Sequence, residues 1–269
     1  MKLIIADFDG TLANTFEVSP NGIGIHEAYN TAIQDIFGRT GIGIYAEIGG
    51  LQNRSPGELI VDILSVAKNK SLLIDNAHMF FRNRNGNLSD LVPEGKGAEL
   101  IWDNSQPETV ISEMLVLRKL EILIAEVGEE WPRPFNGVLP FFKRCYEEMA
   151  KVVLLTSGHE LFVKKVFSCW GIDVPGMITD DDLRGKIPYL SKPNPALIKL
   201  ALEQSSGGDP VCYIGDDPIK DGQLAQNSGL PFLWFNPSKE KPASGFPENT
   251  VEFDNWTELS DYLFLIIRK

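Results

Sequence analysis

Two carboxylates stand two residues apart near the start of the chain, at Asp7 and Asp9. The apolar residues 3–6 precede them and Gly10 follows, which is typical of a buried strand that ends in a turn. Ligands bind at the carboxyl ends of such strands in parallel sheets. One carboxylate can act as a nucleophile, and a second beside it can donate and accept protons. Asp7 is therefore the candidate nucleophile, and Asp9 is the candidate general acid and base.

Two polar segments later in the chain could bind an anion. Thr156 and Ser157 follow the apolar run 152–155, so hydroxyl and backbone N–H groups are expected at a strand end and a helix start. Lys192 could neutralise an anion or a carboxylate in the same place. His159 is expected on the helix surface or at the rim of the substrate site, because the pair of carboxylates already offers an acid and a base.

A third segment, which follows the apolar run 211–214, contains Asp216, Asp217 and Asp221. Parallel strands end at one edge of a sheet, so Asp7, Asp216 and Asp221 are expected to converge there. They would repel one another unless a cation lay among them. Mg²⁺ prefers a few carboxylate oxygens together with water and substrate oxygens. The sequence therefore predicts a Mg²⁺ site at this edge.

Strands and helices alternate from residue 134 onward. Short apolar runs typical of buried strands occur at 152–155, 177–178, 211–214 and 231–235. Helical periodicity separates these runs, which favours crossover connections and a doubly wound, Rossmann-like parallel sheet in an α/β fold. The first apolar run of the chain belongs most simply to the same sheet.

Residues 16–134 have a different character, with apolar residues at three-to-four spacing and no convincing strand. Residues 25–37 show this spacing and end at Gly38, a plausible helix stop. The sequence thus predicts an α/β core domain of residues 1–15 and 135–269. A mostly helical domain of residues 16–134 is inserted after the first strand.

The composition limits the partners of this chain. Its formal net charge of -12 at pH 7 repels phosphate backbones and anionic lipids, so neither nucleic acid nor membrane is expected to bind. No apolar stretch approaches the roughly 20 residues that span a bilayer. The N-terminus lacks the features of a signal peptide, so a cytoplasmic location is expected. The chain is expected to act as a monomer or a homodimer.

The order of these motifs resembles the haloacid dehalogenase (HAD) superfamily of phosphohydrolases. The matching positions are Asp7, Asp9, Gly10, Thr11, Thr156, Lys192 and the segment 215–221. The position of the helical insertion resembles members with a cap after the first motif, of the phosphoglycolate phosphatase and beta-phosphoglucomutase kind. The resemblance covers residues 1–15 and about 135–236, and the cap matches in helical character alone.

The resemblance implies a Mg²⁺-dependent phosphatase that hydrolyses a small phosphorylated metabolite through an aspartyl phosphate. It gives the nucleophile's role to Asp7 and the role of general acid and base to Asp9. It also implies that Asp7 and Asp216 coordinate Mg²⁺ directly and that the backbone carbonyl of Asp9 contributes. Asp217 or Asp221 would support the metal from the outer shell.

The remaining polar groups are candidates for binding the substrate. Thr156, Ser157 and Lys192 would bind the transferring phosphoryl group and balance its charge. Arg54 lies in an expected loop between helices of the insertion, and its guanidinium group is a further candidate for substrate binding.

Two alternatives stay open. In a phosphomutase of the beta-phosphoglucomutase type, a sugar hydroxyl rather than water accepts the phosphoryl group, a difference that depends on closure and water exclusion. A non-catalytic protein could also keep the fold and bind a phosphate ligand. Dehalogenation is disfavoured, because that chemistry needs neither the second carboxylate at Asp9 nor the full metal set.

Overall fold

The computed structural model describes residues 1–50, 56–84, 101–183, 190–239, 241, 247 and 249–268. The chain forms two compact units. The first unit comprises Met1–Thr15 and Gly128–Lys269, and the second comprises Phe16–Val127. We call them the core unit and the cap unit.

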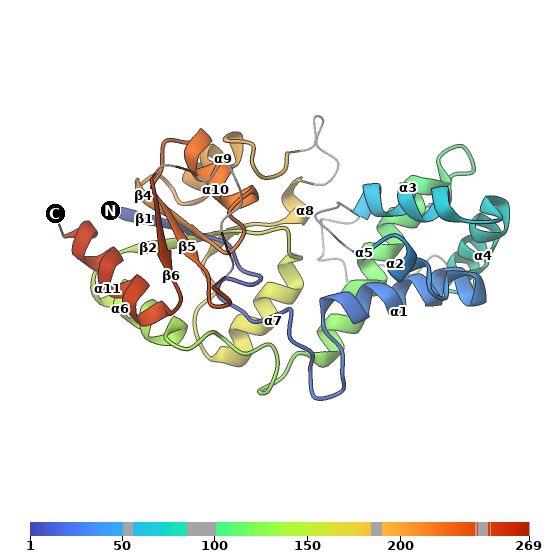
Figure 1. Ribbon diagram of the computed structural model, residues 1–269, viewed down its shortest axis with the longest axis horizontal. Coiled ribbons are helices and arrows are strands. Elements are labelled where there is room, and N and C mark those ends of the chain that lie inside the picture. The colour runs from blue at the N-terminus through green and yellow to red at the C-terminus, as the bar shows by residue number, and fades with distance from the viewer. Residues whose placement is uncertain are drawn as a thin grey trace. The chain divides into compact units, whose positions relative to one another are not determined.

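A parallel sheet of six strands forms the centre of the core unit (Figure 1). The strands are β1 (Lys2–Ala6), β2 (Lys151–Leu155), β3 (Gly176–Ile178), β4 (Asp209–Gly215), β5 (Phe232–Phe235) and β6 (Thr250–Phe253). They lie in the order β3-β2-β1-β4-β5-β6, so the chain winds outward from β1 in both directions. The predicted doubly wound parallel sheet is confirmed.

Helices cover both faces of this sheet, as Figure 1 shows for α6 and α11 on one side and α9 and α10 on the other. One face packs against α6 (Val138–Glu147), α7 (Glu160–Trp170) and α11 (Trp256–Ile267). Its packing is aromatic, with the Phe8 and Phe167 rings 5.9 Å apart and the Phe141 and Trp256 rings 4.9 Å apart. The other face packs against α8 (Asp180–Leu183), α9 (Ala196–Gln204) and α10 (Lys220–Asn227). Burial on both faces explains the continuous apolar runs of the central strands.

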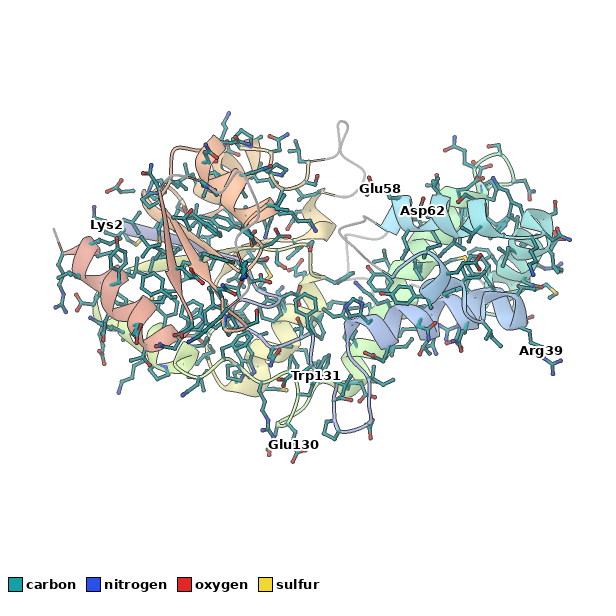
Figure 2. The ribbon with its side chains drawn as sticks, in the orientation of Figure 1. Lys2, Arg39, Glu58, Asp62, Glu130 and Trp131 are labelled. Atoms are coloured by element: carbon teal, nitrogen blue, oxygen red, sulfur yellow. The ribbon has the colours of Figure 1, made fainter. Side chains whose placement is uncertain are left out.

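The cap unit is helical, and no strand occurs among its described residues. Its elements are α1 (Ile25–Phe37), the 3₁₀ helix η1 (Gly38–Gly41), α2 (Ile44–Glu47), α3 (Pro56–Val66), α4 (Lys70–Asn83) and α5 (Pro107–Glu126). Ile33 of α1, Ile60 of α3 and Met114 of α5 belong to one buried cluster. Glu58 and Asp62 lie one turn apart on α3 (Figure 2). The helical character predicted for the insertion is confirmed.

Of the helices in the described part of the chain, none has the length and apolar character to cross a bilayer.

Two segments that lead to and from the cap unit pair with each other in antiparallel fashion. The backbone N–H of Asn14 donates to the carbonyl of Arg133 at 3.0 Å. The N–H of Phe135 donates to the carbonyl of Leu12, also at 3.0 Å. The chain is therefore anchored to the core unit just before it enters the cap unit. It is anchored there again just after it returns.

The second connection between the units lies at Val127–Gly128, seven residues before the boundary expected from the sequence. Residues 128–134 pack with the core unit, because Trp131 is 3% exposed and its ring lies 5.9 Å from that of Phe162 on α7. The neighbouring Glu130 is exposed and points away from the unit (Figure 2). The buried ring of Trp131 thus places the end of the predicted helical domain in the core unit.

Candidate active site

The candidate site lies where the neighbouring strands β2, β1 and β4 end. Asp7 follows β1, Thr156 follows β2, and Asp216 follows β4. The strand pairing continues into this edge, since the N–H of Asp7 donates to the carbonyl of Ile214 at 2.9 Å. The strand order reverses at β1, and open α/β sheets bind ligands at such a point.

Lys192 joins two of the carboxylates. Its Nζ lies 2.9 Å from Oδ2 of Asp7 and 2.8 Å from Oδ1 of Asp221. The side chains of Lys192, Asp7 and Asp221 are 11%, 14% and 0% exposed, so this is a buried ion-pair network. The structure therefore places Lys192 beside Asp7, although 185 residues separate them in the sequence.

Burial raises the pKa of the three carboxyl groups at this edge. The pKa of Asp7 is raised and that of Asp216 is raised well above its ordinary value, while the pKa of Asp221 is raised to about 6. Mutual repulsion adds to the effect of burial, and the ammonium group of Lys192 opposes it. Because one cation faces three buried carboxyl groups, the cluster carries an excess of negative charge.

Asp216 is held by its side chain and by its backbone. The hydroxyl of Thr11 donates to its Oδ1 at 2.9 Å, and the indole N–H of Trp234 donates to its carbonyl oxygen at 2.9 Å. Thr11 and Trp234 are fully buried or nearly so. These contacts fix the loop after β4 relative to both the Asp7 loop and β5.

The structure separates the roles that the sequence left open for Asp217 and Asp221. Oδ1 of Asp217 accepts the backbone N–H groups of Ile219 and Lys220 at 2.8 and 2.9 Å, at the start of α10. Asp221 lies one helical turn later and faces the buried cluster. Asp217 thus stabilises the turn, while Asp221 lies with Asp7.

The donor set at this edge fits a hard divalent cation. Asp7, Asp216 and Asp221 each offer a ligand atom, and these atoms lie within 4.8 Å of one another. Carboxylate oxygens are the donors that Mg²⁺ prefers. A divalent cation would also relieve the negative charge that raises the pKa of these groups.

Asp9 and Thr156 meet at Gly158. Thr156 is 3% exposed, and its hydroxyl oxygen accepts the N–H of Gly158 at 2.9 Å. A Cβ atom on Gly158 would lie 3.1 Å from Oγ1 of Thr156 and 3.2 Å from Oδ2 of Asp9. The glycine therefore leaves room for both polar groups, while the adjacent Ser157 is exposed.

The expectation that His159 lies on the helix surface is wrong. This residue is 4% exposed and is the N-cap of α7, where its Nδ1 accepts the N–H of Leu161 at 3.4 Å. It does not lie on the helix surface, because the turn after Thr156 directs the imidazole ring back to the first turn of the helix. Arg54 lies outside the described residues.

Three residues that contact the acidic cluster have no role predicted from the sequence. These residues are Thr11, Tyr213 and Trp234. Thr11 belongs to the first motif, so its position alone could have identified it. Tyr213 and Trp234 lie inside apolar strands, where an aromatic residue ordinarily indicates packing.

Comparison with known proteins agrees with this architecture. The chain matches the family model of haloacid dehalogenase-like hydrolases over residues 1–229. Fold and site thus define a Rossmann-like α/β protein with an acidic site at its strand ends, and the chain belongs to the haloacid dehalogenase-like hydrolase family. A search of curated proteins gives no match.

Solved structures share the fold at low sequence identity. A 2-haloacid dehalogenase from Pseudomonas syringae pv. Tomato is 18% identical, with 99% of each chain covered and a TM-score of 0.57. CbbY from Rhodobacter sphaeroides, in complex with phosphate, is 17% identical, with 96% of this chain and 95% of that chain covered and a TM-score of 0.57. A HAD phosphatase from Thermococcus onnurineus is 17% identical, with 98% of each chain covered and a TM-score of 0.50.

Proposed function

We propose that this hydrolase is a Mg²⁺-dependent phosphatase of a small phosphorylated metabolite. The observation that carries the proposal is the arrangement around Asp7, whose Oδ2 lies 2.9 Å from Nζ of Lys192 at the edge where Asp216 and Asp221 also converge. A carboxylate nucleophile, a buried ammonium group and an acidic metal cluster are together suited to phosphoryl transfer.

In the first step a carboxylate oxygen of Asp7 attacks the phosphorus atom, and the bond from phosphorus to the ester oxygen breaks. Asp9 gives its proton to the departing alkoxide, which leaves as an alcohol. The Thr156 hydroxyl and Lys192 bind the phosphoryl oxygens and balance their charge. The product of this step is an aspartyl phosphate on Asp7.

In the second step Asp9, now ionised, takes a proton from water, and the water oxygen attacks the aspartyl phosphate. Inorganic phosphate leaves and Asp7 is regenerated. Asp7, Asp216 and the Asp9 backbone carbonyl would hold Mg²⁺, with Asp221 in support. The bound ion supplies positive charge for the phosphoryl oxygens.

A sugar phosphate is a reasonable substrate class to test first. CbbY, which shares the fold, has been solved with phosphate and with xylulose-(1,5)bisphosphate. Asp9 also favours phosphate ester hydrolysis over dehalogenation, because a halide leaves without a proton whereas an alkoxide needs one.

The test is phosphate release from a panel of phosphorylated metabolites, with Mg²⁺ and with EDTA. Asp7→Asn keeps the size of the side chain and removes the nucleophile, so activity is expected to fall by about 10³-fold or more. Asp209→Asn is the matched control, because exposed Asp209 begins β4 at the end opposite the site and pairs there with Lys2. Figure 2 labels Lys2.

Release that requires both Mg²⁺ and Asp7, and that survives in Asp209→Asn, supports the proposal. Equal release by the wild type and Asp7→Asn would overturn the assignment of Asp7 as the nucleophile. Isomerisation of a sugar phosphate without net phosphate release would identify the mutase instead. Chloride release from a 2-chloroacid, without phosphate release, would assign dehalogenation.

A further inference from the structure

Tyr213 is a buried tyrosine of β4 whose hydroxyl reaches the acidic cluster. Its side chain is fully buried on the sheet face that packs against α9 and α10. The hydroxyl lies 3.1 Å from Oδ1 of Asp221, and Nζ of Lys192 lies 5.6 Å from the centre of the ring. Tyr213 therefore contacts both members of the Lys192–Asp221 pair from within the sheet.

The hydrogen bonds of Asp221 define what the hydroxyl does. Oδ1 of Asp221 accepts from Nζ of Lys192 at 2.8 Å and from the hydroxyl of Tyr213 at 3.1 Å. Oδ2 accepts the backbone N–H of Asp217 at 3.2 Å. A phenol has one proton to donate, and its other acceptor, the carbonyl of Leu155, is farther away at 3.4 Å and uncharged. The hydroxyl is thus one of three donors that fix a fully buried carboxylate.

The position of Lys192 depends on how strongly Asp221 attracts it. Nζ of Lys192 is almost equally distant from Asp7 and Asp221, at 2.9 and 2.8 Å. A lysine side chain is flexible, so its ammonium group moves toward the carboxylate that carries more uncompensated charge. The Tyr213 hydroxyl compensates part of the charge on Asp221 and leaves more of the Lys192 interaction to Asp7.

We propose that Tyr213 is a positioning residue that acts through Asp221 to hold the Lys192 ammonium group beside Asp7. The inference rests on the proposed function, in which Lys192 balances charge when a phosphoryl group reaches Asp7. Removal of the hydroxyl would let Lys192 shift toward Asp221, so the cation would be misplaced during transfer although the substrate could still bind.

Tyr213→Phe tests this role, because it removes the hydroxyl and keeps the ring. We expect kcat to fall about tenfold and KM to stay within about twofold, the pattern of an interaction that matters mainly in the transition state. The matched control is Tyr29→Phe in the cap unit. Tyr29 is also buried and has an ammonium group over its ring, with Nζ of Lys119 at 5.0 Å from the centre, but it belongs to the hydrophobic cluster of the cap unit. Tyr29→Phe is expected to keep the wild-type kcat.

A double-mutant cycle distinguishes positioning from simple packing. In the Lys192→Met background the ammonium group is absent, so adding Tyr213→Phe should leave kcat unchanged within about twofold. The same tenfold loss in both backgrounds would overturn the proposal, since the tyrosine would then act without Lys192. An unchanged kcat for Tyr213→Phe alone would also overturn it.

The cycle remains decisive if the wild type hydrolyses no phosphate ester. That result would overturn the proposed function but would not test the coupling between Tyr213 and Lys192. The same four proteins can then be compared by urea unfolding. Non-additive free energies of unfolding for Tyr213→Phe and Lys192→Met would support the coupling. Additive values would overturn it, including when Tyr213→Phe is itself less stable than the wild type.

Discussion

Gly158 is a residue of the candidate site at which the absence of a side chain matters. Its missing Cβ leaves space for Oγ1 of Thr156 and Oδ2 of Asp9, which would lie 3.1 and 3.2 Å from that atom. Gly158→Ala is therefore expected to displace one of these groups and to lower kcat about tenfold or more, as small misplacements of catalytic groups do. Steady-state kinetics on the best substrate of the panel would measure this loss.

Gly128→Ala is the control for this substitution, because a Cβ atom at Gly128 meets nothing within 4 Å. It should leave kcat and the melting temperature unchanged. Wild-type kcat in Gly158→Ala would show that Asp9 and Thr156 do not need the space that the glycine provides.

At the scale of residues, the sequence identifies the groups that stand directly at strand ends. Asp7, Thr156 and Asp216 are of this kind, because an apolar run followed by a polar residue predicts both the strand and its end. It could not separate Asp217 from Asp221, since the distinction depends on which side chain caps α10 and which faces inward. Tyr213 was missed because its ring is an ordinary core group and only its hydroxyl reaches the site.

Among the elements, α11 depends on a cap at its first turn. The side chain of Asn255 accepts the backbone N–H of Glu258 at 2.9 Å. Asn255→Ala removes this acceptor and should cost about 1 kcal/mol of stability. For a protein of this size that loss lowers the melting temperature by roughly 2–4 °C.

Asn255→Ser keeps an oxygen acceptor for the helix and places no second carboxylate beside Asp254, which accepts the Asn255 amide N–H at 2.9 Å, so its stability should stay close to that of the wild type. Calorimetry of the three proteins measures both effects. Equal melting temperatures for the alanine variant and the wild type would show that water replaces the cap without cost.

The apolar runs of the sequence predicted β1 to β5 but not β6. β1, β2 and β4 are continuous apolar runs because the sheet buries both of their faces. β6 was not predicted, since it is four residues long, lies at the edge of the sheet and contains the exposed Glu252. An edge strand pairs on one side only, and its sequence shows correspondingly less apolar character.

For the molecule as a whole, Mg²⁺ is expected to stabilise the folded protein at pH 7.5. An ion that binds the folded state alone adds about 2.7 kcal/mol when its concentration is a hundredfold above Kd. Asp216→Asn should abolish the rise in melting temperature, and Asp209→Asn should keep it. The prediction fails if the rise is the same in Asp216→Asn as in the wild type.

The rise in melting temperature that Mg²⁺ causes should be smaller at pH 5. Burial raises the pKa of Asp221 to about 6 in the metal-free protein, so its carboxyl group is largely protonated at pH 5 and ionised at pH 7.5. When folding raises the pKa of a carboxyl group, the free energy of unfolding falls as the pH rises from the ordinary pKa to the raised pKa. A divalent cation offsets that cost only where the group is ionised. Thermal melts with Mg²⁺ and with EDTA at both pH values measure the difference.

The pairing of the two connecting segments has a consequence for how such a chain diversifies. The backbone of Asn14 bonds to Arg133 and that of Phe135 bonds to Leu12, so the points of exit and return are neighbours. Paired antiparallel residues have Cα atoms about 5 Å apart, a gap that a tight turn closes. The cap unit can therefore be exchanged as a whole for another insertion. Such an exchange is expected to leave in place the strand ends that carry the carboxylates.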